Sequence, residues 1–349
     1  MKKLLLLVLV LAFALSGVFV SNVFAAEKLN PTPEKPAILR ISCALSPGYS
    51  SSLSTIEWCK YIEANSGGRI KTQFFDSGSL YSQSNALEAL MMGMCEGAIF
   101  LPTDFTKILP EWNIVQVSAI LDTPEHYAKI ADGEVGARLF EGLETKGLKG
   151  IALIPNGGYG KNGPGFVTKC YPIKVPADFA GLKIRTAQPT EAALIAKYGG
   201  VPVTLPGGDV FMALQLGTID GTTCGLNHFS QRKFQETGAI YYAASPLKGR
   251  VFYSTVLNKD FFDKLPSDLQ ILLLESGKRI IDVGYRQGAV EVDEVNNQYA
   301  VDHGVLIYEV TPEDTAAWKV DFDLDMEALK ADNPGSKELF EMIEEIRRQ

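Results

Sequence analysis

Residues 175–185 read VPADFAGLKIR, residues 199–203 read GGVPV, and residues 209–221 read DVFMALQLGTIDG. In and between these stretches, short apolar runs alternate with segments whose apolar residues recur at helical spacing and end at glycine. Strands that alternate with helices indicate an α/β fold, in which ligands bind beyond the carboxyl ends of the strands. The predicted elements are strands at 182–186, 201–205 and 221–224 and helices at 190–198 and 209–216.

The pattern extends in both directions from this block. A first series of alternating strands and helices precedes it, and the chain returns toward that first series at 246–257. Two α/β lobes joined by crossing segments form a hinge with a cleft, and such clefts hold small molecules. Further predicted elements are strands at 38–45, 69–75, 98–101, 150–155, 165–169 and 305–310 and helices at 52–65 and 84–94.

The central block resembles the extracytoplasmic solute receptors of tripartite ATP-independent periplasmic (TRAP) transporters, the C4-dicarboxylate-receptor-like (DctP-like) family. That family has D-L-K-G-L-K-I-R, then G-x-x-P-V, then A-L-Q-x-G-x-x-D-G, in this order and near this spacing. Weaker matches are S-G-G-R-I at 66–70, F-D-S-G-S-L at 75–80, and Asn258 with Leu265-Pro266. The resemblance covers about residues 38–310. It implies an α/β, two-lobed periplasmic binding protein fold with a central cleft, a mixed sheet flanked by helices in each lobe, and a long helix spanning both lobes.

The segment 266–303 is predicted to be that long helix, because it has no proline and its apolar residues recur at helical spacing. Two helices broken near 284–288 are the alternative. The predicted organisation is a signal peptide at 1–25, a leader at 26–37, lobe I at 38–155 plus about 246–265, lobe II at 156–245, the long helix at 266–303, and a C-terminal strand and helices at 304–349 packing on the lobes.

The amino terminus predicts export. Lys2 and Lys3 precede the apolar run 4–15, and Val23-Phe24-Ala25 has small residues where a signal peptidase cleaves. We therefore expect cleavage after Ala25 and a mature protein in the periplasm, without membrane insertion. An uncleaved anchor helix is the alternative, because residues 4–26 could just span a bilayer.

Composition excludes several classes of function. The 349 residues include 33 Lys+Arg and 41 Asp+Glu, giving a net charge of −8, which argues against nucleic acid as a partner. The three histidines lie far apart in no metal-binding pattern, and no metal is expected. No cofactor is expected either. The widely spaced cysteines fit small buried apolar residues better than disulfides. They are Cys43, Cys59, Cys95, Cys170 and Cys224.

One motif has to be set aside. Residues 158–163 read GYGKNG, which matches G-x-G-x-x-G after an apolar strand. A dinucleotide site requires a helix to begin there, whereas Pro164-Gly165 and a predicted strand follow. We interpret this segment as a glycine-rich loop beside the cleft, with Lys161 and Asn162 as candidate ligand contacts. No catalytic motif is recognisable in the chain, so no catalytic residue is proposed.

The resemblance assigns the ligand-binding role to Arg185, because the family's arginine at the end of K-I-R binds the ligand carboxylate. A planar guanidinium can donate two parallel hydrogen bonds to a carboxylate. The alternative for Arg185 is an ion pair at the surface or between the lobes. The family's Q-E-N after D-G is replaced here by Thr222-Thr223-Cys224, so Asn227 or His228 is expected to supply the missing contact.

Several aromatic residues are further candidates for the ligand-binding site. They are Tyr49, Tyr159, Phe211 and Tyr253. A single fixed arginine among aromatic side chains would suit a monocarboxylate with an apolar part, with Lys161 as the nearest second cation.

The sequence thus predicts a solute-binding protein that delivers a small organic acid to a TRAP-type membrane permease. A periplasmic hydrolase or lyase on a similar scaffold and the receptor of an ATP-driven importer are the alternatives.

Overall fold

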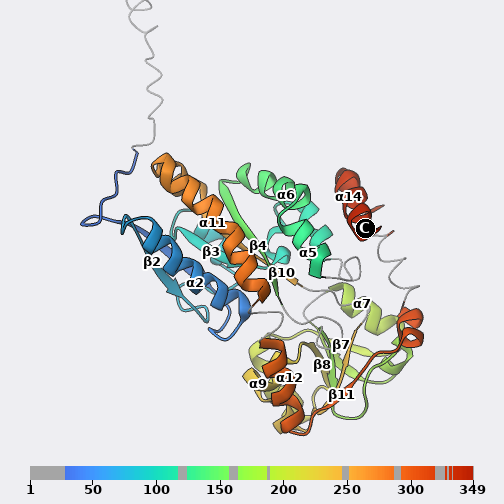
Figure 1. Ribbon diagram of the computed structural model, residues 1–349. Coiled ribbons are helices and arrows are strands. Elements are labelled where there is room, and N and C mark those ends of the chain that lie inside the picture. Colours follow the sequence, from blue (N-terminus) through green and yellow to red (C-terminus); the bar gives the residue numbers. More distant parts are fainter. Residues whose placement is uncertain are drawn as a thin grey trace, which may run out of the picture.

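The computed structural model describes residues 28–116, 124–156, 164–186, 189–245, 251–286, 292–318, 327, 330–331 and 333–348. The chain forms two α/β lobes, each built on one mixed sheet (Figure 1). The predicted signal peptide, the glycine-rich segment 157–163 and the middle of the predicted long helix at 287–291 lie outside the described residues.

Lobe I contains a sheet with the strand order β2-β1-β3-β10-β4. β1 pairs in parallel with β2 and β3, whereas β10 pairs antiparallel with both β3 and β4. The strands are β1 (Ala37–Cys43), β2 (Ile70–Phe75), β3 (Gly97–Phe100), β4 (Leu148–Asn156) and β10 (Val251–Asn258). The helices are α2 (Ser50–Asn65), α3 (Ala86–Met91), α4 (Pro102–Phe105), α5 (Pro124–Ala131), α6 (Glu134–Glu144), α10 (Lys259–Lys264), α11 (Ser267–Arg286) and α14 (Lys337–Arg348), with the 3-10 helix η1 (Pro110–Gln116).

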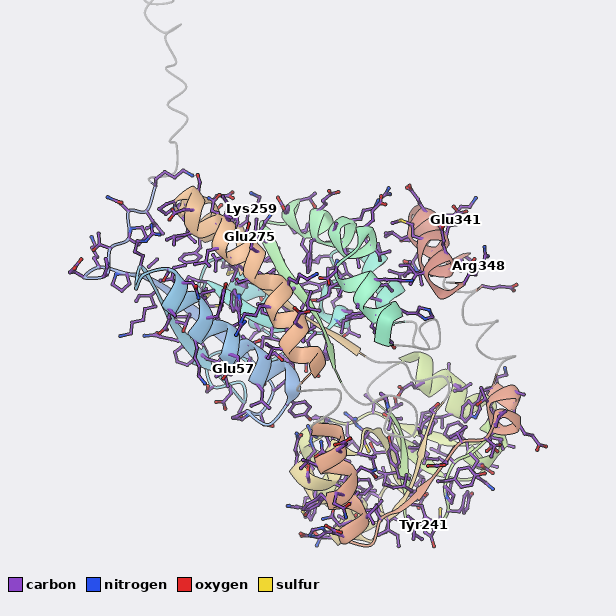
Figure 2. All side chains as sticks on the ribbon, in the orientation of Figure 1. Glu57, Tyr241, Lys259, Glu275, Glu341 and Arg348 are labelled. Carbon is purple, nitrogen blue, oxygen red and sulfur yellow. The ribbon has the colours of Figure 1, made fainter. Side chains whose placement is uncertain are left out.

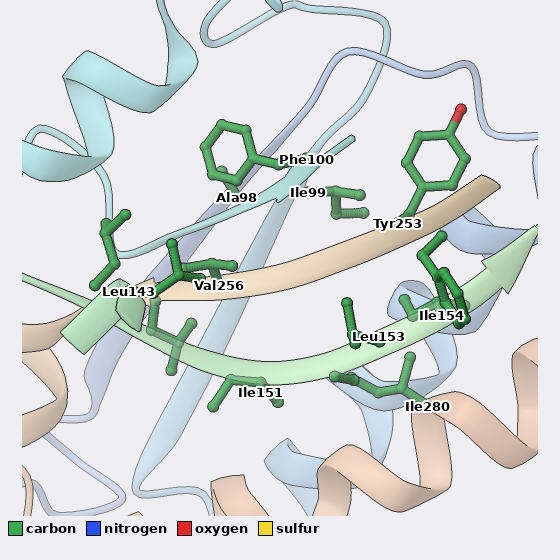
Figure 3. Close-up of a cluster of buried hydrophobic side chains, with 14 of the residues drawn as sticks. Ala98, Ile99, Phe100, Leu143, Ile151, Leu153, Ile154, Tyr253, Val256 and Ile280 are labelled. Carbon is green, nitrogen blue, oxygen red and sulfur yellow. The ribbon is translucent and has the colours of Figure 1, made fainter. Parts of the chain in front are cut away.

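One buried apolar cluster fills lobe I. Figure 3 shows Ile280 of α11 near Leu153 of β4 on one side of the sheet, with Phe100 and Tyr253 on the other side. The hydroxyl of Tyr253 points away from its strand. The charged residues Lys259 and Glu275 lie on the outside of this lobe (Figure 2).

Lobe II contains a sheet with the order β11-β9-β5-β8-β6-β7. β6, β7 and β8 run parallel to one another, and β5 pairs antiparallel with β8 and β9. The strands are β5 (Gly165–Thr168), β6 (Lys183–Arg185), β7 (Val201–Val203), β8 (Gly221–Cys224), β9 (Tyr241–Ala244) and β11 (Leu306–Tyr308). The helices are α7 (Pro189–Lys197), α8 (Val210–Leu216), α9 (Asn227–Arg232) and α12 (Val292–Asp302), with the 3-10 helices η4 (Pro176–Phe179), η5 (Gly207–Asp209) and η6 (Phe234–Thr237).

The part of the chain after β10 contributes elements to both lobes. α11 packs on α2 and β4 of lobe I, whereas α12 packs on α9 of lobe II (Figure 1). Beyond them, β11 joins the lobe II sheet and α14 packs on α5 and α6 of lobe I. Continuity of helix through 287–291 stays a prediction.

The five cysteines are all free, as expected, and four of them are buried. Burial raises the pKa of the Cys59 thiol to about 12 and that of Cys95 to about 11, so both are protonated at neutral pH. The expectation of burial is wrong for Cys170, which is exposed. It lies just beyond the end of β5, where Tyr171 is exposed as well.

Gly277 lets α11 approach the lobe I sheet closely. A Cβ at this position would lie far inside contact distance of the backbone carbonyl of Ile151 in β4. Alanine would gain up to about 1 kcal/mol of helix propensity, but overpacking against immovable backbone costs about 1–3 kcal/mol or more. We expect Gly277→Ala to lower the free energy of unfolding by about 2 kcal/mol in urea titrations. Ile271→Ala, on the exposed face of α11, is the control, and equal stability of the two variants would contradict the close approach.

Candidate functional site

The carboxyl edge of the lobe II sheet gathers three chain segments. Parallel β6, β7 and β8 all end at this edge, so the residues that follow them lie near one another. Arg185 is the last residue of β6 and pairs with Val203 and Thr222, while the buried Ile184 anchors the strand beneath it. The loop 204–206 and the 3-10 helix η5 follow β7, and α9 follows β8.

Arg185 is half-buried and is fixed by one backbone acceptor. Its Nε donates to the carbonyl of Leu205 at 3.0 Å. Burial lowers its pKa, the charge of Arg232 lowers it further, and Glu191 opposes both. Among the residues that the structure describes, Arg185 forms no salt bridge with a carboxylate. An incompletely compensated cation at this position favours an anionic ligand.

A second guanidinium, that of Arg232, is near enough for its charge to act on Arg185. It comes from the last residue of α9, and its Nη1 donates to the carbonyl of Gly207, two residues along the loop from the acceptor of Arg185. No residue in the described part of the chain forms a salt bridge with Arg232 either. One loop therefore orients two arginines.

Lobe I brings Tyr49 and Tyr253 to the carboxyl ends of β1 and β3. Tyr253 is near the start of antiparallel β10, whose next residue, Ser254, pairs with Phe100 at the end of β3. Burial raises the pKa of Tyr253, Tyr49 raises it further, and the charge of Arg232 acts in the opposite direction. Arg232 of lobe II is therefore close enough to influence a phenol of lobe I.

Direct contacts join the two edges. The side chain of Gln231 on α9 donates to the carbonyl of Gly48 at 3.2 Å. The rings of Tyr49 and His228 meet edge to face, with centroids 6.4 Å apart. Six residues lie at these two facing edges, and we call this group the interlobe site. They are Tyr49, Arg185, Asn227, His228, Arg232 and Tyr253.

Asn227 and His228 are engaged with each other and with nearby backbone. The Nδ1 atom of His228 lies 3.2 Å from both the carbonyl oxygen of Gly225 and the Oδ1 of Asn227, and these two acceptors favour the tautomer with the proton on Nδ1. The His228 ring also stacks on Phe234. Their predicted contacts with a ligand stay predictions.

The other predicted site residues separate into two groups. Phe211, on α8, is partly buried and packs against the apolar core of lobe II. Tyr159, Lys161 and Asn162 lie outside the described residues. Binding of a ligand by these four residues stays a prediction.

Sequence reasoning missed Arg232. The sequence pointed to Arg185 as a single fixed arginine, whereas the structure also brings Arg232 near it; which of them binds a ligand stays a prediction. A signal was present: Arg232 follows the third of three predicted parallel strands, at the same carboxyl edge as Arg185. Within the described ranges, no group of three or more His, Cys, Asp or Glu side chains could hold a metal ion, and no helix is both long and apolar enough to cross a bilayer.

Comparison with known families gives a match over most of the chain. Residues 41–330 match the bacterial extracellular solute-binding proteins of family 7. The chain is 27% identical to a C4-dicarboxylate-binding periplasmic protein of Rhodobacter capsulatus over 297 residues, which cover 83% of this chain and 85% of that protein. It is 28% identical to a 2,3-diketo-L-gulonate-binding periplasmic protein of Escherichia coli, with coverage of 69% and 71%.

Solved structures show the same two-lobed fold. A TRAP periplasmic solute-binding protein from Chromohalobacter salexigens with bound D-glucuronate has a TM-score of 0.80 at 21% identity, over 88% of this chain and 99% of that one. Another, from Sulfurospirillum deleyianum with bound succinate, has a TM-score of 0.72 at 24% identity, over 89% and 98%. The expected fold class is confirmed.

Proposed function

Because the chain belongs to family 7 of the bacterial extracellular solute-binding proteins, we propose that it captures a small organic acid between its lobes and delivers it to a TRAP-type membrane permease. The proposal treats the interlobe site as the ligand cleft. It follows the expectation that the mature chain is exported to the periplasm and acts there as a receptor, without turning its ligand over.

The observation that carries this proposal is the state of Arg185. Within the described residues, this half-buried guanidinium donates from Nε to a carbonyl and has no carboxylate partner. None of the described residues accepts a hydrogen bond from its two Nη atoms, which could bind a carboxylate bidentately. An acid bound there would supply the missing negative charge.

The nature of the ligands of similar proteins supports an acid. The named ligands of the relatives and of the solved structures include a C4-dicarboxylate, succinate and D-glucuronate, all of which contain carboxylate groups. These proteins differ in the rest of their ligands. The carboxylate is therefore the part of the ligand that we assign to Arg185.

Matched pairs of an acid and its primary amide test this assignment. The amide keeps the size and shape of the acid, but it has no charge and has an NH2 donor in place of one acceptor oxygen. We expect at least one acid in a panel of aliphatic acids, uronates and aromatic acids to raise the thermal unfolding midpoint, and its amide to have no effect. Equal stabilisation by acid and amide would contradict binding through a carboxylate.

The two alternatives make different predictions. An enzyme would convert the bound acid, so the acid recovered after long incubation would differ from the acid added. A receptor of an ATP-driven importer would bind an acid in the same way, but uptake of that acid in cells would require ATP hydrolysis. Our proposal predicts an unchanged acid and uptake that stops when the ion gradients across the membrane are collapsed.

Ligand binding is expected to draw the lobes together. The contacts of Gln231 with Gly48 and of His228 with Tyr49 link chain segments that can separate when the hinge opens. Closure buries the ligand and excludes water. Small-angle scattering should give a smaller radius of gyration for the ligand-saturated protein than for the ligand-free protein. Identical profiles at saturation would contradict closure.

A further inference from the structure

The described part of the leader is folded onto lobe I. The amide of Leu29 donates to the carbonyl of Lys264 at the end of α10, and the amide of Ala37 donates to the segment just before β2. Between these points the backbones of Thr32 and Lys35 bond to each other in both directions at 3.1 Å. This stretch also includes three prolines, which restrict the backbone of the unfolded chain. The leader is therefore a fixed part of the lobe I surface.

The leader and the end of α10 enclose a concave site with a volume of about 530 Å³. The charged residues that line it are Lys28, Lys35 and Lys264, and none of the described aspartates or glutamates lines it. Glu34, which precedes Lys35, is exposed and lies outside the lining. In a chain of net charge −8, a hollow lined by cations without an acidic residue favours an anion.

The carboxylate nearest in sequence to Lys264 is engaged elsewhere. Asp263 binds Lys259 through its side chain at 2.6 Å. Its backbone carbonyl instead accepts a hydrogen bond from Nζ of Lys28 at 2.6 Å, which fixes that ammonium and leaves it two further N–H donors. Among the described residues, no carboxylate forms a salt bridge with Lys28, Lys35 or Lys264. The three charges of the hollow are thus left for a ligand.

The hollow lies at the end of lobe I opposite the interlobe site. Parallel β1, β2 and β3 end at the interlobe site, whereas the leader runs into the start of β1 and α10 follows the end of antiparallel β10. In Figure 1 the leader lies at the outer end of lobe I, away from lobe II. A ligand in the hollow would therefore not compete with an acid bound between the lobes.

We propose that Lys28, Lys35 and Lys264 form a second binding site, which takes the phosphate group of an anionic ligand. Phosphate is tetrahedral, so its charged oxygens diverge toward donors from separate segments, and lysine binds it as a point charge. The phosphate belongs either to a small soluble molecule or to the headgroup of an anionic phospholipid. A bound headgroup would hold lobe I to the membrane by the end opposite the cleft. This inference does not rest on the proposed function.

Two probes distinguish the two sources of phosphate. Inorganic phosphate, followed by the broadening of its phosphorus NMR signal, tests a soluble ligand, and acetate as a competitor tests selectivity for phosphate. Vesicles of phosphatidylcholine with or without phosphatidylglycerol, followed by co-sedimentation, test a membrane. The site variant replaces the three lysines of the hollow with glutamine. The matched control, of equal net charge, replaces three exposed lysines elsewhere, as Lys107→Gln, Lys183→Gln and Lys337→Gln.

We expect the wild type to bind at least one probe, and added salt to weaken the binding. For vesicles, each lysine removed from the hollow should weaken binding about fivefold and the site variant about a hundredfold. For inorganic phosphate, the site variant should lose the broadening. The control variant should behave like the wild type in both assays. Binding of inorganic phosphate alone identifies a soluble ligand, whereas vesicle binding that requires phosphatidylglycerol identifies a membrane.

Three results would overturn the inference: neither probe binds the wild type, acetate displaces phosphate at equal concentration, or the control variant loses as much binding as the site variant. The last result would show that net charge alone is responsible. Circular dichroism checks that both variants fold. Failure of the proposed function would leave these results unchanged, because they are measured without the organic acid.

Discussion

Replacement of Arg185 by alanine is expected to weaken binding of the organic acid by about 2–5 kcal/mol, or roughly 30-fold to several-thousand-fold in Kd. The side chain lies at the end of β6, half-buried, with Nε held by Leu205. In the proposed complex, its loss would remove two charge-assisted hydrogen bonds and leave a partly desolvated carboxylate without its partner. Calorimetric titration of the wild type and the variant measures the difference.

Two controls separate this role from a structural one. Arg185→Lys keeps the charge but loses the planar fork, so it should bind weakly as well. The ligand-free stability of Arg185→Ala should fall by no more than about 1 kcal/mol, because among the described residues the variant loses the hydrogen bond to Leu205 but no salt bridge, and repulsion from Arg232 is relieved. A variant that loses stability but keeps its affinity would show that Arg185 is a structural residue.

Replacement of Trp318 by alanine is expected to lower the free energy of unfolding by about 3–5 kcal/mol. Trp318, in the helical stretch 312–318, is fully buried and stacks on Phe166 with centroids 6.2 Å apart. Its Nε1 donates to the carbonyl of Lys174 at 2.7 Å. Truncation would leave both a cavity and an unsatisfied carbonyl. Urea titration measures the loss.

Trp318 also packs beneath the strand that ends in Arg185. Trp318 belongs to the same buried group as Ile184, the residue before Arg185. Trp318→Phe keeps most of the packing and loses the hydrogen bond, so it should cost about 1–3 kcal/mol. A cost below about 1 kcal/mol for Trp318→Ala would contradict its role as the anchor of the C-terminal segment on lobe II.

Local sequence patterns predicted most of the strands. The strands expected at 38–45, 69–75 and 98–101 appear as β1, β2 and β3 with ends shifted by one or two residues. Most of their apolar residues lie in the core, as the pattern predicts, although Ile38 of β1 is exposed. Between β3 and β4, α4, α5 and α6 were not predicted. The position of β10 between β3 and β4 could not be read from its own residues, because the partners of a strand depend on distant segments.

The site was predictable only in part for the same reason. Arg185 follows a motif and ends a strand, so its position could be inferred. Arg232 belongs to no recognised motif. Its place near Arg185 depends on a contact with Gly207 and on the approach of α9 to Gly48, and both contacts join residues far apart in the sequence.

Native mass spectrometry of the protein, purified without heating or extensive dialysis, tests the central claim most directly. We predict that the folded protein has an excess mass that disappears on denaturation, and that the released molecule is a carboxylic acid. The same preparation of Arg185→Ala should have little or none of this excess. A released molecule without a carboxylate, or equal occupancy in the wild type and Arg185→Ala, would contradict capture of an organic acid by Arg185.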